Sequence, residues 1–336
     1  MLIEKRSIMI DFKLGQVLST LWKTKEFVLF RFLIYMGITL AYIIGTGGGG
    51  GIGYMLGSVG DGKETGLFYG MVGGFSLVSG ILFYVREYLL YLVKAGHIAV
   101  IVKHLDGEPM PEGKGQVKYA QEVVKARFKE SSVLFGVDQL IKGVLKTFSR
   151  IFSGVMSFLP IIPPPIVKFI NGVVNMSLTY VDEVILAYYI RNNSQNPWED
   201  SRKALVLYAQ NYKTFLKNAL FLTIITWVLS LLVLIIVFAP LAAGLSLIGY
   251  SGNAWVFILA IVTAWGIKAA LIDPIAMTAL MQVFFKVTEG QEPNPEWEAK
   301  LERGSKKFTA LKDKAVAWGK SKFGGKDQDA PQLDEK

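Results

Sequence analysis

Apolar residues along this chain are gathered into long blocks that are separated by polar stretches. Four blocks reach or approach the roughly 20 residues that a helix needs to cross a bilayer. The polar stretches, at most roughly 50 residues long, lack the apolar content to build a soluble core. The pattern therefore predicts an all-α, multi-pass helical membrane protein, whose four clear spans lie at residues 27–44, 67–85, 218–241 and 254–287.

A fifth apolar region, residues 132–190, has a different pattern. Its first half carries a charged stripe opposite its apolar face, at every fourth residue: Asp138, Lys142, Lys146 and Arg150. Such a stripe cannot face lipid at depth. A proline-rich turn at 160–165 leads into a second apolar segment, so we interpret the region as a helical hairpin that either spans the bilayer or re-enters it. For the stripe itself, we favour a helix lying on the membrane surface over one lining a polar cavity.

A glycine run, Gly47–Gly51, follows the first predicted span, and Gly53, Gly57, Gly60 and Gly62 come after it. The run lacks the Lys-Ser/Thr pair of phosphate-binding loops. We interpret it as an outward loop joining two spans, in preference to a flexible gate or a close approach of two backbones.

Charge divides the remaining segments between the two sides of the membrane. The outward loops, 45–66 and 242–253, contain Lys63 as their one basic residue. Because basic residues concentrate in cytoplasmic loops, both termini are predicted in the cytoplasm and the protein in the cell (inner) membrane. The predicted units are a basic arm (1–26), a two-span hairpin (27–85), a cytoplasmic amphipathic helix and linker (86–131), the proline-tipped hairpin (132–190), a cytoplasmic helix (191–217), a two-span unit with a broken last helix (218–287) and a basic tail (288–336).

Several polar residues are given structural interpretations. Arg31 lies in the first turn of its span and is expected to reach the headgroups. His97 and His104, seven residues apart, are placed on the polar face of an interfacial helix over 88–105. Asn196 is predicted to cap a helix that starts at Pro197, and residues 295–320 are predicted to form a basic interfacial helix.

Composition narrows the function. The chain is 52% apolar and 19% charged, with a formal charge of +9 and no cysteine. Anionic lipid headgroups explain that charge better than nucleic acid, because the basic residues sit beside apolar blocks. The absence of cysteine excludes disulfides and thiol chemistry, and no catalytic motif is found. We therefore expect no enzyme, cofactor or metal site, and we leave a homo-oligomer or a partner subunit open.

Ionisable residues within apolar segments are the remaining candidates, because charge at depth is costly. Lys268 and Asp273 lie in the middle of the last span, five residues apart, and do not face each other on an unbroken helix unless Pro274 kinks it. Asp273 is either a structural partner of Lys268 or a residue of a transport path. The other candidates are Asn175, Asp182, Glu183 and the charged stripe, and we expect Asp182 and Glu183 near the cytoplasmic interface.

Residues 175–218 resemble the choline-transporter-like family of membrane proteins, through the order Ser201, Arg202, Ala204, Leu207 and Asn211 ahead of a long span. Asp273 and the exit sequence 288–294 resemble that family's closing span. The resemblance covers about the last two-thirds of the chain and implies a transporter-like membrane fold. The chain departs from the family in lacking its roughly ten spans and its large extracellular loop, and in the basic character of its stripe.

Two hypotheses follow. The first is a transporter, permease or channel for a small solute or ion, with a path lined by the 133–190 hairpin and the broken 254–287 segment. The second is a non-transporting membrane scaffold or lipid-interacting subunit, which would use its basic amphipathic elements at 88–105, 133–159 and 295–320.

Overall fold

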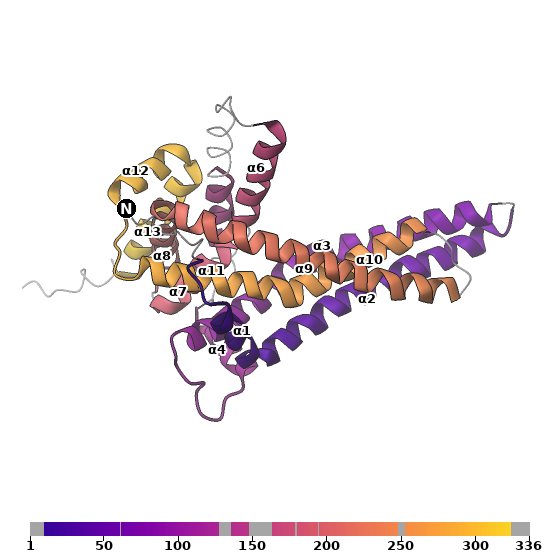
Figure 1. The fold of residues 1–336 in the computed structure, drawn as a ribbon, viewed down its shortest axis with the longest axis horizontal. Coiled ribbons are helices and arrows are strands. Elements are labelled where there is room, and N and C mark those ends of the chain that lie inside the picture. Colours follow the sequence, from indigo (N-terminus) through magenta and orange to yellow (C-terminus); the bar gives the residue numbers. More distant parts are fainter. Residues whose placement is uncertain are drawn as a thin grey trace, which may run out of the picture.

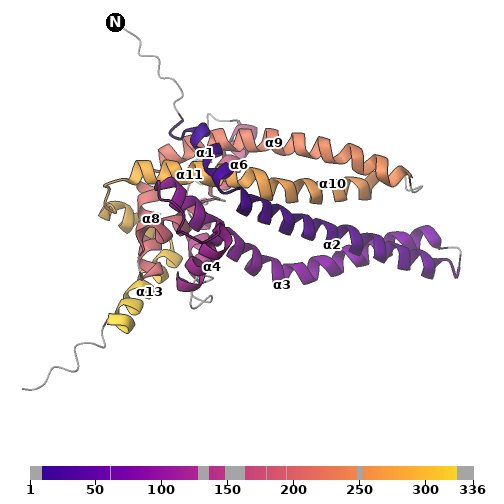
Figure 2. The same cartoon turned by 90° about the horizontal axis from the view of Figure 1, so that it is seen from below.

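The described part of the chain forms two long helical hairpins attached to a bundle of shorter helices (Figure 1). The computed structural model describes residues 10–60, 62–127, 136–147, 163–178, 180–193, 195–247 and 253–323, and these ranges contain helices and no strand. The first hairpin, arm 1, consists of α2 (Lys25–Gly57) and the first half of α3 (Lys63–Leu105). The second, arm 2, consists of α9 (Tyr212–Leu247) and α10 (Asn253–Ile267). Figure 2 shows both arms extending in the same direction.

Four helices in the described ranges are long and apolar enough to cross a membrane, as predicted: Lys25–Gly57, Lys63–Phe83, Tyr212–Gly244 and Ala254–Thr288. Large apolar side chains point outward along the arms, among them Leu33 (59% exposed) and Ile236 (68% exposed). A run of exposed apolar side chains of this length suits lipid and not water. The arms therefore carry the membrane-protein character of the chain.

The glycine run lies inside α2 and is not a loop, so the predicted outward loop is wrong. Four glycines of α2, spaced four apart, face three glycines of α3 and the Gly62 that precedes it: Gly45 faces Gly74, Gly49 faces Gly70, Gly53 faces Gly66, and Gly57 faces Gly62. A Cβ atom at Gly53 would collide with the carbonyl oxygen of Gly66. The structure therefore has the alternative arrangement, a close approach of the α2 and α3 backbones. In lipid, a helix satisfies the hydrogen-bonding groups of the backbone, so the glycine run is helical. Because glycine has no side chain, two such helices can approach closely.

The head is the bundle at the base of the arms (Figure 1). It consists of the second half of α3, the second half of α11 (Asp273–Thr288) and a set of shorter helices: α1 (Leu14–Lys23), α4 (Gln116–Arg127), a helix over 136–147, α7 (Val181–Asn192), α8 (Pro197–Gln210), α12 (Pro295–Gly304) and α13 (Lys306–Phe323). α6 (Pro164–Leu178) packs beside α9 and leads into the head.

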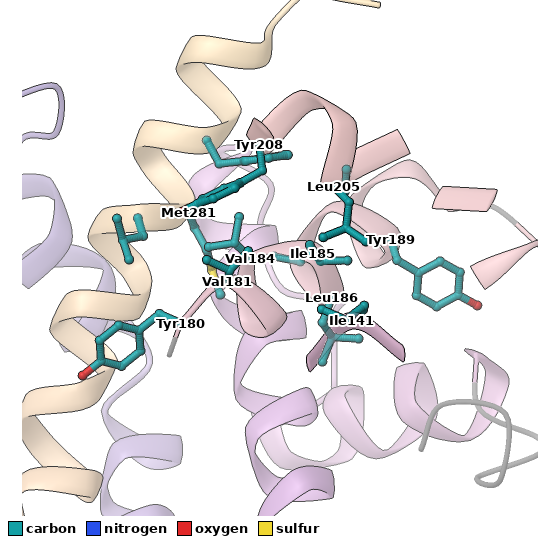
Figure 3. Close-up of a cluster of buried hydrophobic side chains, with 14 of the residues drawn as sticks. Ile141, Tyr180, Val181, Val184, Ile185, Leu186, Tyr189, Leu205, Tyr208 and Met281 are labelled. Carbon is teal, nitrogen blue, oxygen red and sulfur yellow. The ribbon is translucent and has the colours of Figure 1, made fainter. Parts of the chain in front are cut away.

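α7 runs through the middle of the head, and its apolar residues are buried on nearly every side (Figure 3). Val184 and Ile185 pack in the same core cluster as Ile141, Leu205 and Met281, which come from the helix over 136–147, α8 and α11. Burial of such residues is the main force that holds the head together.

Three segments predicted to lie on the membrane surface instead pack into the head. In α3, His97 and its neighbours from Ala95 to Val102 are buried or nearly so, which overturns the predicted polar face of 88–105. In the helix over 136–147, Val137 and Val144 belong to the head core, so the stripe helix packs on protein. Arg150 and residues 160–162 of the proline tip lie outside the described residues. An amphipathic pattern fits a protein surface as well as a lipid surface, which explains the error.

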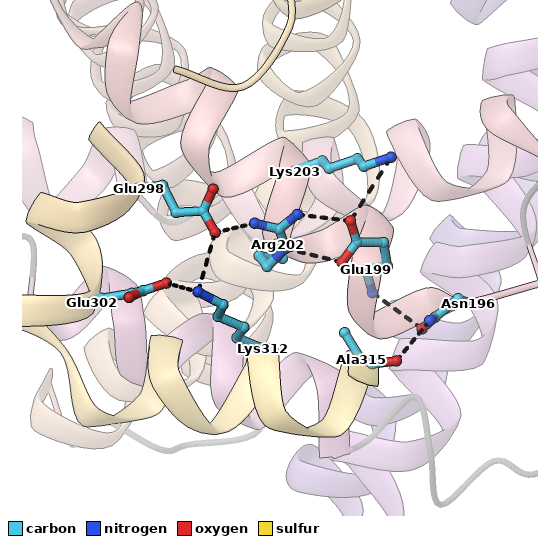
Figure 4. A network of polar contacts seen from close by, with 8 residues as sticks. All are labelled: Asn196, Glu199, Arg202, Lys203, Glu298, Glu302, Lys312 and Ala315. Carbon is cyan, nitrogen blue, oxygen red and sulfur yellow. Dashed lines mark hydrogen bonds and ion pairs between the residues drawn. The ribbon is translucent and has the colours of Figure 1, made fainter. Parts of the chain in front are cut away.

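The basic tail forms two helices that pack against α8. Phe308 and Leu311 are fully buried there, so the predicted lipid-facing stripe faces protein. Polar contacts reinforce the packing (Figure 4): Arg202 pairs with Glu199 and Glu298, and Lys312 pairs with Glu302.

Asn196 caps α8 as predicted, accepting a hydrogen bond from the Glu199 N–H at 3.2 Å. Its Nδ2 also donates to the carbonyl of Ala315 at 3.0 Å, which joins the start of α8 to α13 (Figure 4).

Candidate functional site

A π-helical turn, Lys268–Ile272, joins α10 to α11 in the last span. A π-helix has hydrogen bonds between residues i and i+5, so side chains about five residues apart point to the same side, and positions 268 and 273 share a face. The Lys268 Nζ lies 2.5 Å from the Asp273 Oδ1, and the Tyr180 hydroxyl donates to the same oxygen at 2.8 Å. The structure thus joins the two predicted candidates by an inserted turn, and Tyr180 connects them to the end of the predicted hairpin. Figure 3 shows the Tyr180 hydroxyl directed away from the apolar core.

Arg31 is fully buried, so the prediction that it reaches the headgroups is wrong. Its Nη2 donates to the Ala269 carbonyl in the π-turn at 2.8 Å, and its Nη1 lies 3.5 Å from the Nδ1 of His97. Lengthened i→i+5 spacing leaves π-turn carbonyls open to outside donors. Arg31 therefore ties α2, α3 and the last span together.

His97 is neutral, because burial and the Arg31 charge lower its pKa well below the usual value. Arg31 can donate and cannot accept, so the Nδ1 of His97 accepts and the Nε2 carries the proton. The Nε2 then donates to the Thr24 Oγ1 at 3.1 Å. Stacking against Phe27, at 5.4 Å between ring centroids, fixes the imidazole plane.

Glu183 is buried (5% exposed) and forms an ion pair with Lys94 of α3. Its position near the cytoplasmic interface stays a prediction. Burial alone would raise the pKa of Glu183, but the Lys94 ammonium outweighs it and the pKa is lowered. Burial and the Glu183 charge raise the pKa of the half-buried Asp182 well above its usual value. Both carboxylates lie in the first turn of α7, where the helix dipole favours negative charge.

The stripe helix contributes one further pair. Asp138 is buried, and its Oδ2 lies 2.7 Å from the Nζ of Lys142, which is exposed. Burial raises the pKa of Asp138 in spite of Lys142, and the Lys94 charge also acts on it. Lys146 is exposed and stays outside this group.

We call the joined residues the basal cluster: Arg31, Lys94, His97, Asp138, Lys142, Tyr180, Asp182, Glu183, Lys268 and Asp273. It lies at the base of the arms, where α2, α3, α7 and the π-turn meet. Charge interactions extend from Arg31 to Tyr180 and Lys94, and from Lys94 to Asp182 and Asp138. Six of the nine predicted candidates belong to it. Asn175 lies in α6, and its side chain is outside the described residues, as is Arg150.

Two atoms of the basal cluster have unused hydrogen-bonding capacity. Within the described ranges, the Arg31 Nε and the Glu183 Oε2 are buried without a hydrogen-bond partner. A buried donor or acceptor without a partner is costly, and in native proteins it commonly marks a bound water, ion or ligand. The same ranges contain no group of three or more His, Asp or Glu residues that could hold a metal ion.

Sequence reasoning missed Arg31, Lys94, His97 and Tyr180 as members of a site. For Arg31 the signal was a charged residue inside an apolar block. Because Arg31 lies near the end of that block, the sequence also allowed its side chain to reach the headgroups. Lys94, His97 and Tyr180 gave no such signal, because their partners are 66 to 93 residues away along the chain.

No family model, no curated protein and no solved structure matches the chain. The resemblance to the choline-transporter-like family therefore stays a prediction from short motifs.

Proposed function

We propose that this membrane protein is a transporter-like permease for a small solute or ion, and that the basal cluster is its binding site. The observation that carries the proposal is the set of charges buried at the base of four apolar helices, with an unpaired donor on Arg31 and an unpaired acceptor on Glu183. Ionisable groups kept at such a cost mark ion, proton or substrate sites.

The break in the last span supports the same proposal. Transporters commonly place their sites at discontinuous helices, and π-turns are frequent at functional positions. Here the break brings a cation and an anion, Lys268 and Asp273, to one face beside Tyr180. A solute with both charges, or an ion exchanging with a proton, suits a cluster that offers both signs.

The loop charges support an orientation with both termini in the cytoplasm and the basal cluster at the cytoplasmic ends of the spans. A solute would then meet the cluster from the cytoplasmic side. The outer parts of the arms offer neutral polar groups, such as the buried hydroxyls of Thr39 and Thr46.

Flux into proteoliposomes tests the proposal with full-length protein. Labelled cations, anions and zwitterions are supplied one class at a time, under an imposed pH gradient and without one. We expect flux for one class, reduced at least about tenfold by Asp273→Asn, since one charged hydrogen bond is worth roughly 1.5–3 kcal/mol. Glu296→Gln, at an exposed carboxylate (72%) of α12, is the matched control and should leave flux unchanged. No flux for any class, or equal flux in Asp273→Asn, would remove the proposal.

One observation favours a second candidate, a membrane scaffold whose arms anchor the head. Residues 32–60, 65–85 and 218–267 contain no charged side chain, so the outer parts of both arms lack any charge that could line a route. In that case the basal cluster holds the arms to the head and carries no solute. Absent flux together with a loss of thermal stability in Asp273→Asn would favour the scaffold.

A further inference from the structure

A basic cavity of about 440 Å³ lies outside the basal cluster, between α1, the end of α3, the end of α7 and α11. That volume is in the range of small-ligand sites. Four cations and one histidine line it, against two carboxylates: Lys13, Lys23, Arg191, Lys286 and His104, with Asp11 and Asp106.

Ion pairing inside the cavity leaves positive charge uncompensated. Arg191 pairs with Asp106 at 2.8 Å, and its guanidinium lies 4.4 Å over the ring of Phe285. Asp11 pairs with Lys217, whose Nζ lies 2.7 Å from the Oδ2. Both acids are thereby occupied.

Lys13, Lys23 and Lys286 are exposed, and no carboxylate in the described part of the chain lies within 4 Å of them. The Nε2 of His104 is buried in the same part of the chain without a hydrogen-bond partner. The cavity therefore offers three ammonium groups and an imidazole to an anion.

α1 also carries an apolar strip, on a different face from the residues that line the cavity. Leu14, Leu18 and Trp22 follow one another at four-residue spacing and are exposed, Trp22 at 73%. Val17 and Thr20, on the other side of the helix, are buried against the protein. α1 leads through Thr24 directly into α2, the first span, so the strip lies where lipid headgroups meet acyl chains. Tryptophan flanked by lysine is typical of that depth.

We propose that the cavity binds the phosphate headgroup of an anionic phospholipid. The charge of the cavity complements a phosphate monoanion. The exposed strip on α1 and the direct connection of α1 to the first span place the cavity near the layer of lipid headgroups. This inference does not depend on transport, because lipid binding is measured without flux.

Native mass spectrometry of the full-length protein in detergent tests the site, with phosphatidylglycerol and phosphatidylcholine of identical chains as probes. The test variant is Lys13→Gln/Lys23→Gln/Lys286→Gln. The matched control, Lys125→Gln/Lys306→Gln/Lys320→Gln, removes the same charge at exposed lysines away from the cavity. We expect the test variant to bind phosphatidylglycerol at least about tenfold more weakly, and the control to match the wild type. Equal weakening in both variants would overturn the proposal, because it would show attraction to overall charge.

A second arm separates a lipid from a free anion. Inorganic phosphate and glycerol phosphate are added as competitors to the wild type with bound phosphatidylglycerol, and we expect neither to displace the lipid at equal concentration. If inorganic phosphate binds the wild type as tightly as phosphatidylglycerol does and displaces it, the ligand is a free phosphate and the lipid assignment is wrong. All substituted side chains are exposed, and a size-exclusion profile identical to wild type confirms that the variants fold.

Discussion

Arg31 shows how a single buried charge organises the base of the arms. Its guanidinium lies in apolar surroundings at 1% exposure, where an unpaired charge would cost several kcal/mol. The Ala269 carbonyl and the His97 ring compensate part of that cost, and each is held by a different helix. The residue therefore couples the position of α2 to that of α3 and of the π-turn.

Arg31→Met should lower the free energy of unfolding by about 2–3 kcal/mol, because the Ala269 carbonyl loses a charged donor. The stability of Arg31→Lys should lie between those of the wild type and Arg31→Met, because an ammonium group cannot bind two partners at once as a planar guanidinium does. The midpoint of thermal unfolding in detergent, followed by tryptophan fluorescence, measures this. Arg303→Met, at an exposed arginine, is the control. An unchanged midpoint for Arg31→Met would contradict the assigned contacts.

Asp182 should give the protein a pH-dependent stability. Burial and Glu183 raise its folded-state pKa above the value of 3.8 that an exposed aspartate has. A group with a raised folded pKa contributes stability below its unfolded pKa, and that stability is lost as pH rises through the folded pKa. Asp182→Asn removes this loss. Its melting temperature should therefore gain on the wild type as pH is raised from about 4 to 8, while the exposed Asp313→Asn should follow the wild type at every pH.

At the scale of the element, the effect of each glycine of arm 1 on helix packing depends on which face of the helix it occupies. Gly53 meets the backbone of α3, whereas Gly51, two residues away on the same helix, has open space around the place of a Cβ atom. Gly53→Ala should destabilise the arm by about 1–3 kcal/mol through overpacking. Gly51→Ala should be neutral or stabilising by up to about 1 kcal/mol, because alanine favours helix more than glycine does. Thermal unfolding of the two variants measures the contrast, and equal effects would contradict the paired-glycine arrangement.

The π-turn makes Lys268 and Asp273 an energetic pair. Lys268→Met and Asp273→Asn should each leave a partner with an unbalanced charge, and the double variant should lose less than the sum of the two. We expect a coupling of about 1 kcal/mol, because both side chains are 23% exposed and solvent screens them. A double-mutant cycle on thermal stability gives this number. Additive effects would show that the contact at 2.5 Å contributes nothing.

The elements could be predicted from the sequence where lipid or a cap dictates them, and less well where two environments accept the same pattern. The four spans and the Asn196 cap follow from apolar length and from side-chain chemistry. The glycine run and the amphipathic tail did not, because a helix partner and a membrane both accept a Gly-rich or one-sided helix. The Lys268–Asp273 pair depends on the π-helical turn, and no residue type in 268–272 predicts such a turn.

The whole molecule combines a lipid-facing part and a protein-facing part, and the boundary between them holds the buried charge. Arms 1 and 2 leave the head in one direction (Figure 2), so the far turns of both arms should lie on one side of the membrane and the head on the other. This arrangement requires the loop at 58–60 and the head surface to be on opposite sides, and the loop charges predict the head in the cytoplasm.

Single-cysteine labelling tests that arrangement directly, because the chain has no cysteine of its own. Val59→Cys, at a position 91% exposed in the far turn of arm 1, should react with a membrane-impermeant maleimide in intact cells. Lys125→Cys, exposed on α4 of the head, should react after permeabilisation alone. The reverse pattern would invert the topology and place the basal cluster at the outer ends of the spans. Labelling of both positions from one side would mean that arm 1 does not cross the membrane, since its far turn and the head would then share a compartment.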